Sequence, residues 1–138
     1  MTVTLPRELR LLEADEQDQG DSLIAQMGGD VVRLAQVRPS MIEFGLPDRR
    51  YRWRYAFWWE FKSQSAKSKL TADQYAFLSA ELDVNELAGC GTLKDLEEFV
   101  GALRTSRETA MLTGRLLVMK WAARGLRPSS RPPRGAGR

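Results

Sequence analysis

Residues 51–61 read YRWRYAFWWEF, and every second residue of this stretch is aromatic. Successive side chains of a β-strand point to opposite faces of a sheet, so the alternation predicts one strand with six rings on one face. We expect this face to be the core face of the sheet, covered by the helices that residues 71–88 and 92–124 predict. The six rings belong to Tyr51, Trp53, Tyr55, Phe57, Trp59 and Phe61.

The opposite face of this predicted strand carries mainly basic side chains. This row consists of Arg50, Arg52, Arg54, Trp58 and Lys62. A core helix could cover this row only by burying unpaired charge, so we expect it in solvent or against an anionic partner. Arginines hold phosphates and aromatic rings stack on unpaired bases, which predicts a binding site for single-stranded DNA or RNA. Trp58 also fits an ordinary surface ring shielded by neighbouring arginine side chains.

Three shorter runs precede the aromatic strand, and they read SLIAQM, DVVRLAQVR and MIEFGL. Turn-forming residues separate them, and Gly28-Gly29 suits a two-residue hairpin turn because both glycines tolerate positive φ. The four runs together predict an antiparallel meander of about four strands over residues 22–62. The alternative is one helix over residues 22–38, in which each of the two glycines would cost about 1 kcal/mol relative to alanine.

The second half of the chain predicts helices. Thr71 with Gln74 forms a capping-box pattern that opens a helix, and we expect this helix to end near Ala88, where GCG follows. Thr92 with Asp95 opens a second helix, whose apolar residues recur at spacings of three and four.

Thr105 with Glu108 repeats the capping pattern, so we expect a break near Arg104 and a helix that continues to Arg124. The fold class predicted from these elements is α+β, an antiparallel β-meander packed by two or three C-terminal helices. The last helix is apolar around most of its circumference, which is typical of a helix that is buried or paired with another chain.

The two ends of the chain differ in composition from the predicted single α+β domain of residues 22–125. Residues 1–21 are an N-terminal segment that begins with either a short edge strand or a helical turn opening at Pro6. The segment continues as an acidic linker over residues 13–21. Residues 126–138 form a basic tail rich in Pro, Arg and Gly, which we expect to be disordered. The tail could neutralise phosphates or act only as a solubilising end. Its arginines are Arg127, Arg131, Arg134 and Arg138.

The net charge of +3 is unevenly distributed along the chain. It is −5 over residues 1–48, +6 over 49–69, −3 over 70–123 and +5 over 124–138. The positive charge therefore concentrates in the aromatic strand with its following loop and in the tail, where a nucleic acid would bind.

The sequence contains no histidine and one cysteine, Cys90. This composition excludes the commonest general base, a zinc site and an internal disulfide. The stretch GCGTLK lacks the spacing of a phosphate-binding loop. We therefore expect no metal, no cofactor and no enzymatic activity. A single cysteine suits a reducing cytosol and no apolar run could cross a membrane, so a cytoplasmic protein with no membrane partner is expected.

A meander whose last strand is basic and aromatic leads here into a polar loop and the capped helix KLTADQYAFLSAELDVNEL. This order over residues 22–88 resembles the single-strand-binding proteins of the transcriptional coactivator and Whirly type. The resemblance implies a curved antiparallel sheet, followed by a helix, that binds unpaired DNA or RNA as a dimer or higher oligomer.

A second hypothesis is that the chain is a small protein-interaction subunit or inhibitor, an accessory component of a larger assembly or a mobile-element protein. The apolar helix at 109–123 would then dock against the partner, and a methionine-rich surface adapts readily to such a partner. The net acidic remainder of the chain favours this hypothesis, and self-association is compatible with both. The candidate partner-binding residues are Met111, Leu112, Leu116, Val118, Met119 and Trp121.

Overall fold

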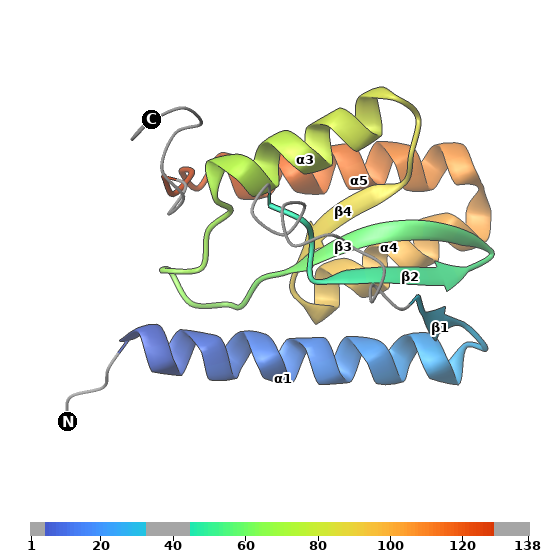
Figure 1. Cartoon of the computed structure of the whole chain (residues 1–138). Helices are drawn as coiled ribbons and strands as arrows, with labels where there is room; N and C mark the ends of the chain where they lie inside the picture. Colours follow the sequence, from blue (N-terminus) through green and yellow to red (C-terminus); the bar gives the residue numbers. More distant parts are fainter. Residues whose placement is uncertain (1–4, 33–44, 129–138) are drawn as a thin grey trace, which may run out of the picture.

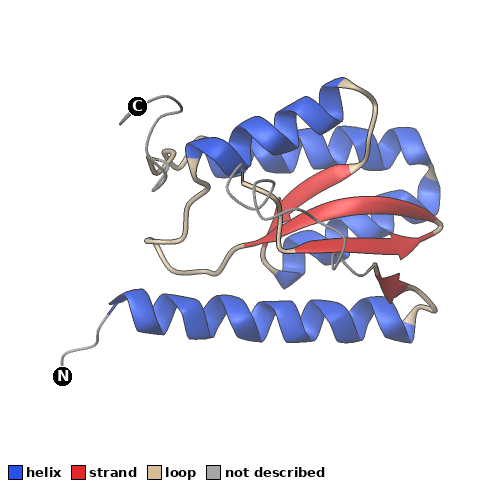
Figure 2. Cartoon of the chain, in the orientation of Figure 1, coloured by secondary structure: helices blue, strands red, loops and turns tan. Residues whose placement is uncertain are grey.

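The computed structural model describes residues 5–32 and 45–128, and it shows an α+β fold with a four-stranded sheet. The predicted fold class is confirmed, and three helices follow the aromatic stretch as expected (Figures 1 and 2). In chain order the elements are α1 (Leu5–Gln26), β1 (Asp30–Val31), β2 (Arg49–Trp53), β3 (Tyr55–Phe61), α3 (Ala72–Asp83), β4 (Ala88–Gly91), α4 (Leu93–Thr105) and α5 (Arg107–Ala122).

The sheet has the strand order β1-β2-β3-β4. The β1–β2 and β2–β3 pairs are antiparallel, whereas β4 pairs with β3 in parallel. The sheet is therefore mixed and not a purely antiparallel meander. The fourth strand comes from the GCG stretch, which was expected to connect two helices, because α3 serves as the crossover that parallel strands require.

The aromatic stretch was predicted as one strand, but it folds back on itself at Arg54 into the β2–β3 hairpin. Trp53 pairs directly with Tyr55, and Arg54 between them has φ of +64°. The alternation of the two faces survives this reversal, because partners across an antiparallel pair share a face. Tyr51 lies opposite Phe57 in this register, so the rings of both strands still gather on one side.

The ring-bearing face is the core face, as predicted, for four of its six rings. Tyr51, Phe57, Trp59 and Phe61 have no exposed surface and pack mainly against residues of α1 and α4. Trp53 is partly buried and Tyr55, at the hairpin tip, is 45% exposed. In Figure 1, α1 lies along one side of the sheet, and α3 with α5 lies toward the opposite side.

The second face of the sheet packs against α3 and α5. Ala88 and Cys90 of β4 join a buried cluster with Leu78 of α3 and with Trp121 of α5. Cys90 has no exposed surface, and burial raises the pKa of its thiol.

Residues 13–21, predicted as an acidic linker, belong to α1, and so does most of the predicted strand SLIAQM. The two glycines at 28 and 29 end this helix and lead into β1 instead of forming a hairpin between two strands. The acidic side chains make contacts with distant elements that sequence patterns do not reveal. Asp21 accepts hydrogen bonds from Arg49 and from the Tyr51 hydroxyl (2.6 Å), and Glu16 accepts one from the backbone N–H of Leu93 (3.1 Å).

The capping boxes predicted at Thr71–Gln74 and Thr92–Asp95 are both present. The predicted break after Arg104 is also present, although the residue that caps α5 is Ser106 and not Thr105. The prediction that this helix ends near Ala88 was wrong, because α3 ends at Asp83. Gly89 of β4 fits where no larger residue would, because a Cβ atom there would lie 2.6 Å from the ring of Trp59.

Parts of the predictions fall on residues outside the described ranges. These are most of the predicted strands at 30–38 and 41–46, and the tail arginines Arg131, Arg134 and Arg138. Within residues 5–32 and 45–128, no helix combines the length and the apolar character needed to cross a membrane.

Candidate active site

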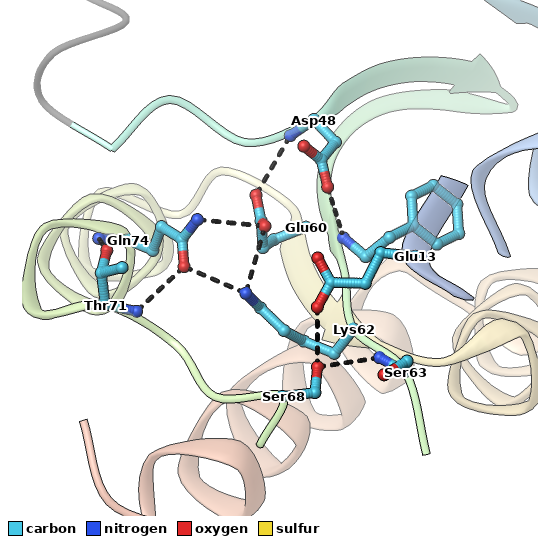
Figure 3. Close-up of polar contacts among 9 residues, drawn as sticks. Glu13, Asp48, Glu60, Lys62, Ser63, Ser68, Thr71 and Gln74 are labelled. Carbon is cyan, nitrogen blue, oxygen red and sulfur yellow. Dashed lines mark hydrogen bonds and ion pairs between the residues drawn. The ribbon is translucent and has the colours of Figure 1, made fainter. Parts of the chain in front are cut away.

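Asp48 and Glu60 meet at the end of the sheet where β2 begins and β3 ends. The hairpin register pairs Arg49 with Trp59, so it brings the residue before β2 alongside the last residues of β3. Lys62 follows Glu60 by two residues and extends the same face. Figure 3 shows the three side chains gathered in one cluster.

Asp48 and Glu60 are held by reciprocal hydrogen bonds. The backbone N–H of Asp48 donates to Oε1 of Glu60 (3.2 Å), and the backbone N–H of Phe61 donates to Oδ2 of Asp48 (3.0 Å). Each carboxylate is therefore fixed by the chain that carries the other one. Lys62 completes the group, because its Nζ lies 3.4 Å from Oε2 of Glu60.

Gln74, the third residue of α3, connects this cluster to the capping box. Its Nε2 donates to Oε2 of Glu60 (3.1 Å), while its Oε1 accepts hydrogen bonds from Nζ of Lys62 (3.3 Å) and from the backbone N–H of Thr71 (2.9 Å). The side chain that caps α3 thus also orients the Glu60 carboxylate and the Lys62 ammonium (Figure 3).

A third carboxylate reaches the cluster from α1. Oε2 of Glu13 accepts a hydrogen bond from the Ser68 hydroxyl (2.9 Å), and this hydroxyl also accepts from the backbone N–H of Ser63 (2.9 Å). The loop after β3 is thereby tied to α1 beside Lys62 (Figure 3).

The cluster combines deep burial with an excess of negative charge. Glu60 and Lys62 are 3% and 4% exposed, whereas Glu13 and Asp48 are partly exposed. Burial, followed by the charge of Asp48, raises the pKa of Glu60 well above its ordinary value, and Lys62 opposes this shift. Burial also raises the pKa of Asp48, against the hydrogen bond from Phe61. With all three carboxylates ionised, one ammonium would leave two negative charges uncompensated, and the raised pKa values of Glu60 and Asp48 favour proton uptake that reduces this excess.

This charge deficit corresponds to one divalent cation. In the described part of the chain, no three side chains of Asp, Glu, His or Cys are arranged as a ready metal cage. Mg²⁺ does not need such a cage, because proteins usually hold it with one or two carboxylates, several waters and the phosphates of a substrate. Asp48 and Glu60 are a carboxylate pair, and both oxygens of Glu60 already accept hydrogen bonds from the chain.

The predicted nucleic-acid-binding residues separate in the structure. Lys62, expected in solvent, is buried because Glu60 and Gln74 provide partners for its ammonium. Arg50 stacks on the Trp58 ring at 4.7 Å, and the Trp58 indole N–H donates to Glu81 of α3 (3.0 Å). The prediction that no helix covers this row was thus wrong for Trp58 and Lys62.

Three predicted binding residues of the described part are exposed. Arg52 pairs with Asp30 (3.0 Å) beside the hairpin, Arg54 lies at its tip, and Arg127 follows α5. The backbone of Arg127 bridges to Thr71, which places the start of the predicted basic tail next to the capping box. A nucleic-acid-binding role for these arginines stays a prediction.

The candidate partner-binding residues of α5 divide into two sets. Val118 and Trp121 are buried in the core, and Met111 is partly buried against it. Leu112, Leu116 and Met119 are 59%, 54% and 60% exposed. The helix therefore packs on the domain and presents an apolar stripe outward.

The reasoning from sequence missed the residues that form this cluster. Glu60 and Asp48 were not among the predicted site residues, and Lys62 was expected to face solvent. Two features of the sequence could have indicated the cluster. Asp48 comes shortly before the aromatic stretch, and the triplet Glu60-Phe61-Lys62 stands at its end. Glu13 and Gln74 have no such signal, because α1 and α3 bring them from elsewhere in the chain.

Comparison of the chain with protein-family models, with curated protein sequences and with solved structures finds no match. The resemblance to Whirly-type single-strand-binding proteins stays a prediction.

Proposed function

We propose that this protein is a cytoplasmic, metal-dependent phosphodiesterase that hydrolyses the backbone of nucleic acids. The observation that carries the proposal is the cluster of Asp48, Glu60, Glu13 and Lys62, in which three carboxylates converge on one ammonium. Buried carboxylates with raised pKa values beside a lysine are typical of functional sites, because burying unneutralised charge is costly for the fold alone.

Asp48 and Glu60 would hold the divalent cation. Glu13 would accept hydrogen bonds from the water molecules bound to this cation. A divalent cation held there would supply Lewis-acid chemistry, which polarises a phosphoryl oxygen and lowers the pKa of a bound water. Lys62, buried and paired with Glu60, would add a fixed positive charge behind the cluster that favours the negative charge developing on the phosphoryl oxygens during attack. Gln74 keeps both Glu60 and Lys62 in position through its two hydrogen bonds.

A nucleic acid is favoured as the substrate by the basic residues around the cluster. The loop that carries Ser63 and Ser68 continues with Lys67 and Lys69, and Arg124 binds the backbone of this loop (Ser65 O, 3.0 Å). Lys67, Lys69, Arg124 and Arg127 form no ion pair within the described ranges. Their charges are therefore available to phosphates, and the predicted basic tail starts among them.

The test is cleavage of labelled single-stranded DNA, duplex DNA and RNA with Mg²⁺, with Mn²⁺ or with EDTA. We expect cleavage only with a metal, and a loss of at least about 100-fold in Asp48→Asn. Asp18→Asn makes the same chemical change at an exposed position of α1 and should leave cleavage unchanged. Cleavage that persists in EDTA or in Asp48→Asn refutes the proposal. Binding without any cleavage returns the protein to non-enzymatic nucleic-acid binding.

A second candidate function rests on the outward face of α5. Glu108, Leu112, Leu116 and Lys120 follow one another at four-residue spacing along an exposed ridge. In a twofold antiparallel pairing with a second copy, Leu112 would contact Leu116 of the other copy, and Glu108 would contact Lys120 of the other copy. Lys120 also forms an ion pair with Asp95 of its own chain (2.9 Å). We propose a homodimer through this ridge, which the mass from light scattering would reveal. Leu116→Lys should give a monomer, and a monomeric wild-type protein would exclude the dimer.

A further inference from the structure

The β2–β3 hairpin ends in two aromatic rings that flank Arg54. Tyr55 is 45% exposed and Trp53 is partly buried. Arg54 adopts the left-handed conformation, φ +64°, which non-glycine residues rarely take. In this conformation its guanidinium lies over the Trp53 ring at 4.9 Å, and Nη1 donates to the backbone oxygen of Arg104 (3.5 Å). The tip is thus a fixed platform of rings and guanidinium groups.

Two arginines from the junction between α4 and α5 extend this platform. Arg104 lies 5.7 Å from the Trp53 ring centroid, and Arg107 lies 5.8 Å from that of Tyr55. Nη1 of Arg107 donates to the side-chain oxygen of Asn85 and Nη2 donates to its backbone oxygen, so the guanidinium group is anchored on Asn85. Residues distant in sequence therefore bring three cations to two rings at one end of the sheet.

These cations lack acidic partners. Arg52 nearby is paired with Asp30, but Arg54, Arg104 and Arg107 form no ion pair with any residue of the described ranges. Three uncompensated positive charges around an exposed ring favour a ligand that combines negative charge with a flat apolar surface. A single strand of nucleic acid has both, in its phosphates and its unpaired bases.

We propose that the hairpin tip, made of Trp53, Arg54, Tyr55, Arg104 and Arg107, is a binding site for single-stranded nucleic acid. An unpaired base stacks on Tyr55 and the arginines hold the flanking phosphates. A base inside a duplex already has both faces stacked on its neighbours, so the site discriminates against duplex.

The inference rests on the proposed function in that the bound strand is the substrate of the Asp48 cluster. Tyr55 and Glu60 are five residues apart in β3, which places the tip about 16 Å from the cluster at ~3.3 Å per residue. A strand held at the tip can therefore extend to the cluster, and an unpaired segment on the substrate sets where cleavage occurs.

The test measures binding separately from cleavage, by the anisotropy of a fluorescent 20-nucleotide single strand and its duplex in EDTA. Tyr55→Ala should weaken single-strand binding about fivefold or more, because stacking on one base is lost. Tyr55→Phe keeps the ring and should bind within about twofold of the wild type. Arg107→Gln should also weaken binding and lower its salt dependence, whereas Lys94→Gln, an exposed charge in the first turn of α4, should change little.

Equal binding by Tyr55→Ala and the wild type overturns the inference, and so does an equal loss for single strand and duplex. Thermal unfolding of each variant checks that the fold is retained, as the exposure of Tyr55 leads us to expect. Because no metal is present, this result does not depend on hydrolysis. If cleavage depends on a metal but Tyr55→Ala binds as the wild type does, only the proposed tip site is refuted. If Tyr55→Ala weakens binding but the wild type shows no cleavage, only the proposed phosphodiesterase activity is refuted.

Discussion

The Nζ atom of Lys62 lies 3.4 Å from Oε2 of Glu60, and both side chains are almost completely removed from solvent. The backbone N–H of Asp48 also donates to Glu60, and the charge of the Asp48 carboxylate raises the pKa of Glu60. The Lys62 ammonium therefore compensates only part of the negative charge that the carboxylates of Glu60, Asp48 and Glu13 can carry. Four properties of the protein follow from this pair and from the packing around the sheet.

Lys62→Met should destabilise the metal-free protein in a pH-dependent way. Breaking a buried ion pair costs about 3–5 kcal/mol when the remaining partner stays charged. Raising the pH toward 8 favours the charged form of Glu60, which the variant leaves among carboxylates, whereas lowering the pH toward 5 favours proton uptake by Glu60 and makes the cost smaller. Urea unfolding in EDTA at both pH values measures the difference. An equal loss at both would mean that Lys62 stabilises only through packing of its aliphatic chain.

The stability of the wild type should fall as pH rises in EDTA. Glu60 and Asp48 have ordinary pKa values near 4.5 and 3.8, and both pKa values are raised in the folded state. At a pH between the ordinary and the raised pKa of each group, the folded protein binds more protons than the unfolded chain. The free energy of unfolding must decrease across this window. The groups that face Glu60 are Asp48, Glu13, Lys62 and Gln74, and the charge of Lys62 opposes the effect. A melting temperature that rises over pH 5 to 8 in EDTA contradicts this assignment.

Asp48→Asn should stabilise the metal-free protein while it abolishes metal binding. Asparagine can still accept the hydrogen bond from Phe61, and the substitution removes one negative charge beside Glu60. We expect a gain of about 1 kcal/mol near pH 8 in EDTA, because like-charge repulsion inside the cluster falls. Mg²⁺ should raise the melting temperature of the wild type and of Asp18→Asn but not of this variant. Equal stabilisation by Mg²⁺ in all three proteins would locate the cation elsewhere.

Two helical glycines should respond to alanine in opposite ways. A Cβ atom at Gly114 of α5 would collide with the backbone oxygen of Ala88, which β4 holds in place, so Gly114→Ala should destabilise by about 2 kcal/mol. Gly101 of α4 has nothing within 4 Å of the same position, so Gly101→Ala should stabilise by about 0.5–1 kcal/mol. Denaturant midpoints compare the pair directly. A stabilised Gly114→Ala would show that α5 is free to move away from β4.

The helices after residue 70 could be predicted because their signals are local. The capping pairs at Thr71 and Thr92 act within one turn, and the apolar spacing of α4 marks the face that Phe99 and Leu103 bury. The face of each aromatic residue was also predictable, since alternation depends only on strand geometry.

The hairpin reversal and the N-terminal helix could not be predicted because long-range contacts decide them. Arg54 has no preference for a turn, and its left-handed conformation is supported by Trp53 and Arg104. The acidic residues of α1 resemble a solvated linker until their partners are known, and those partners lie in β2 and α4.

The candidate site was lost for the same reason. Lys62 was assigned to a solvent-facing row, whereas α3 covers both Lys62 and Glu60 through the side chain of Gln74, which hydrogen-bonds to each of them. Only the hairpin register reveals that Asp48 lies beside Glu60. A fold prediction that misses the reversal at Arg54 therefore cannot bring the two carboxylates together.

Cys90, enclosed between β4 and α5 with its Sγ facing the backbone oxygen of Leu117, makes the chain convenient for site-specific labelling. It is the single thiol of the sequence, and it is shielded from maleimide reagents in the folded protein. A cysteine introduced at an exposed position could therefore carry a dye without removal of the native residue. Energy transfer from such a dye to a labelled oligonucleotide would then follow a strand along the sheet in real time.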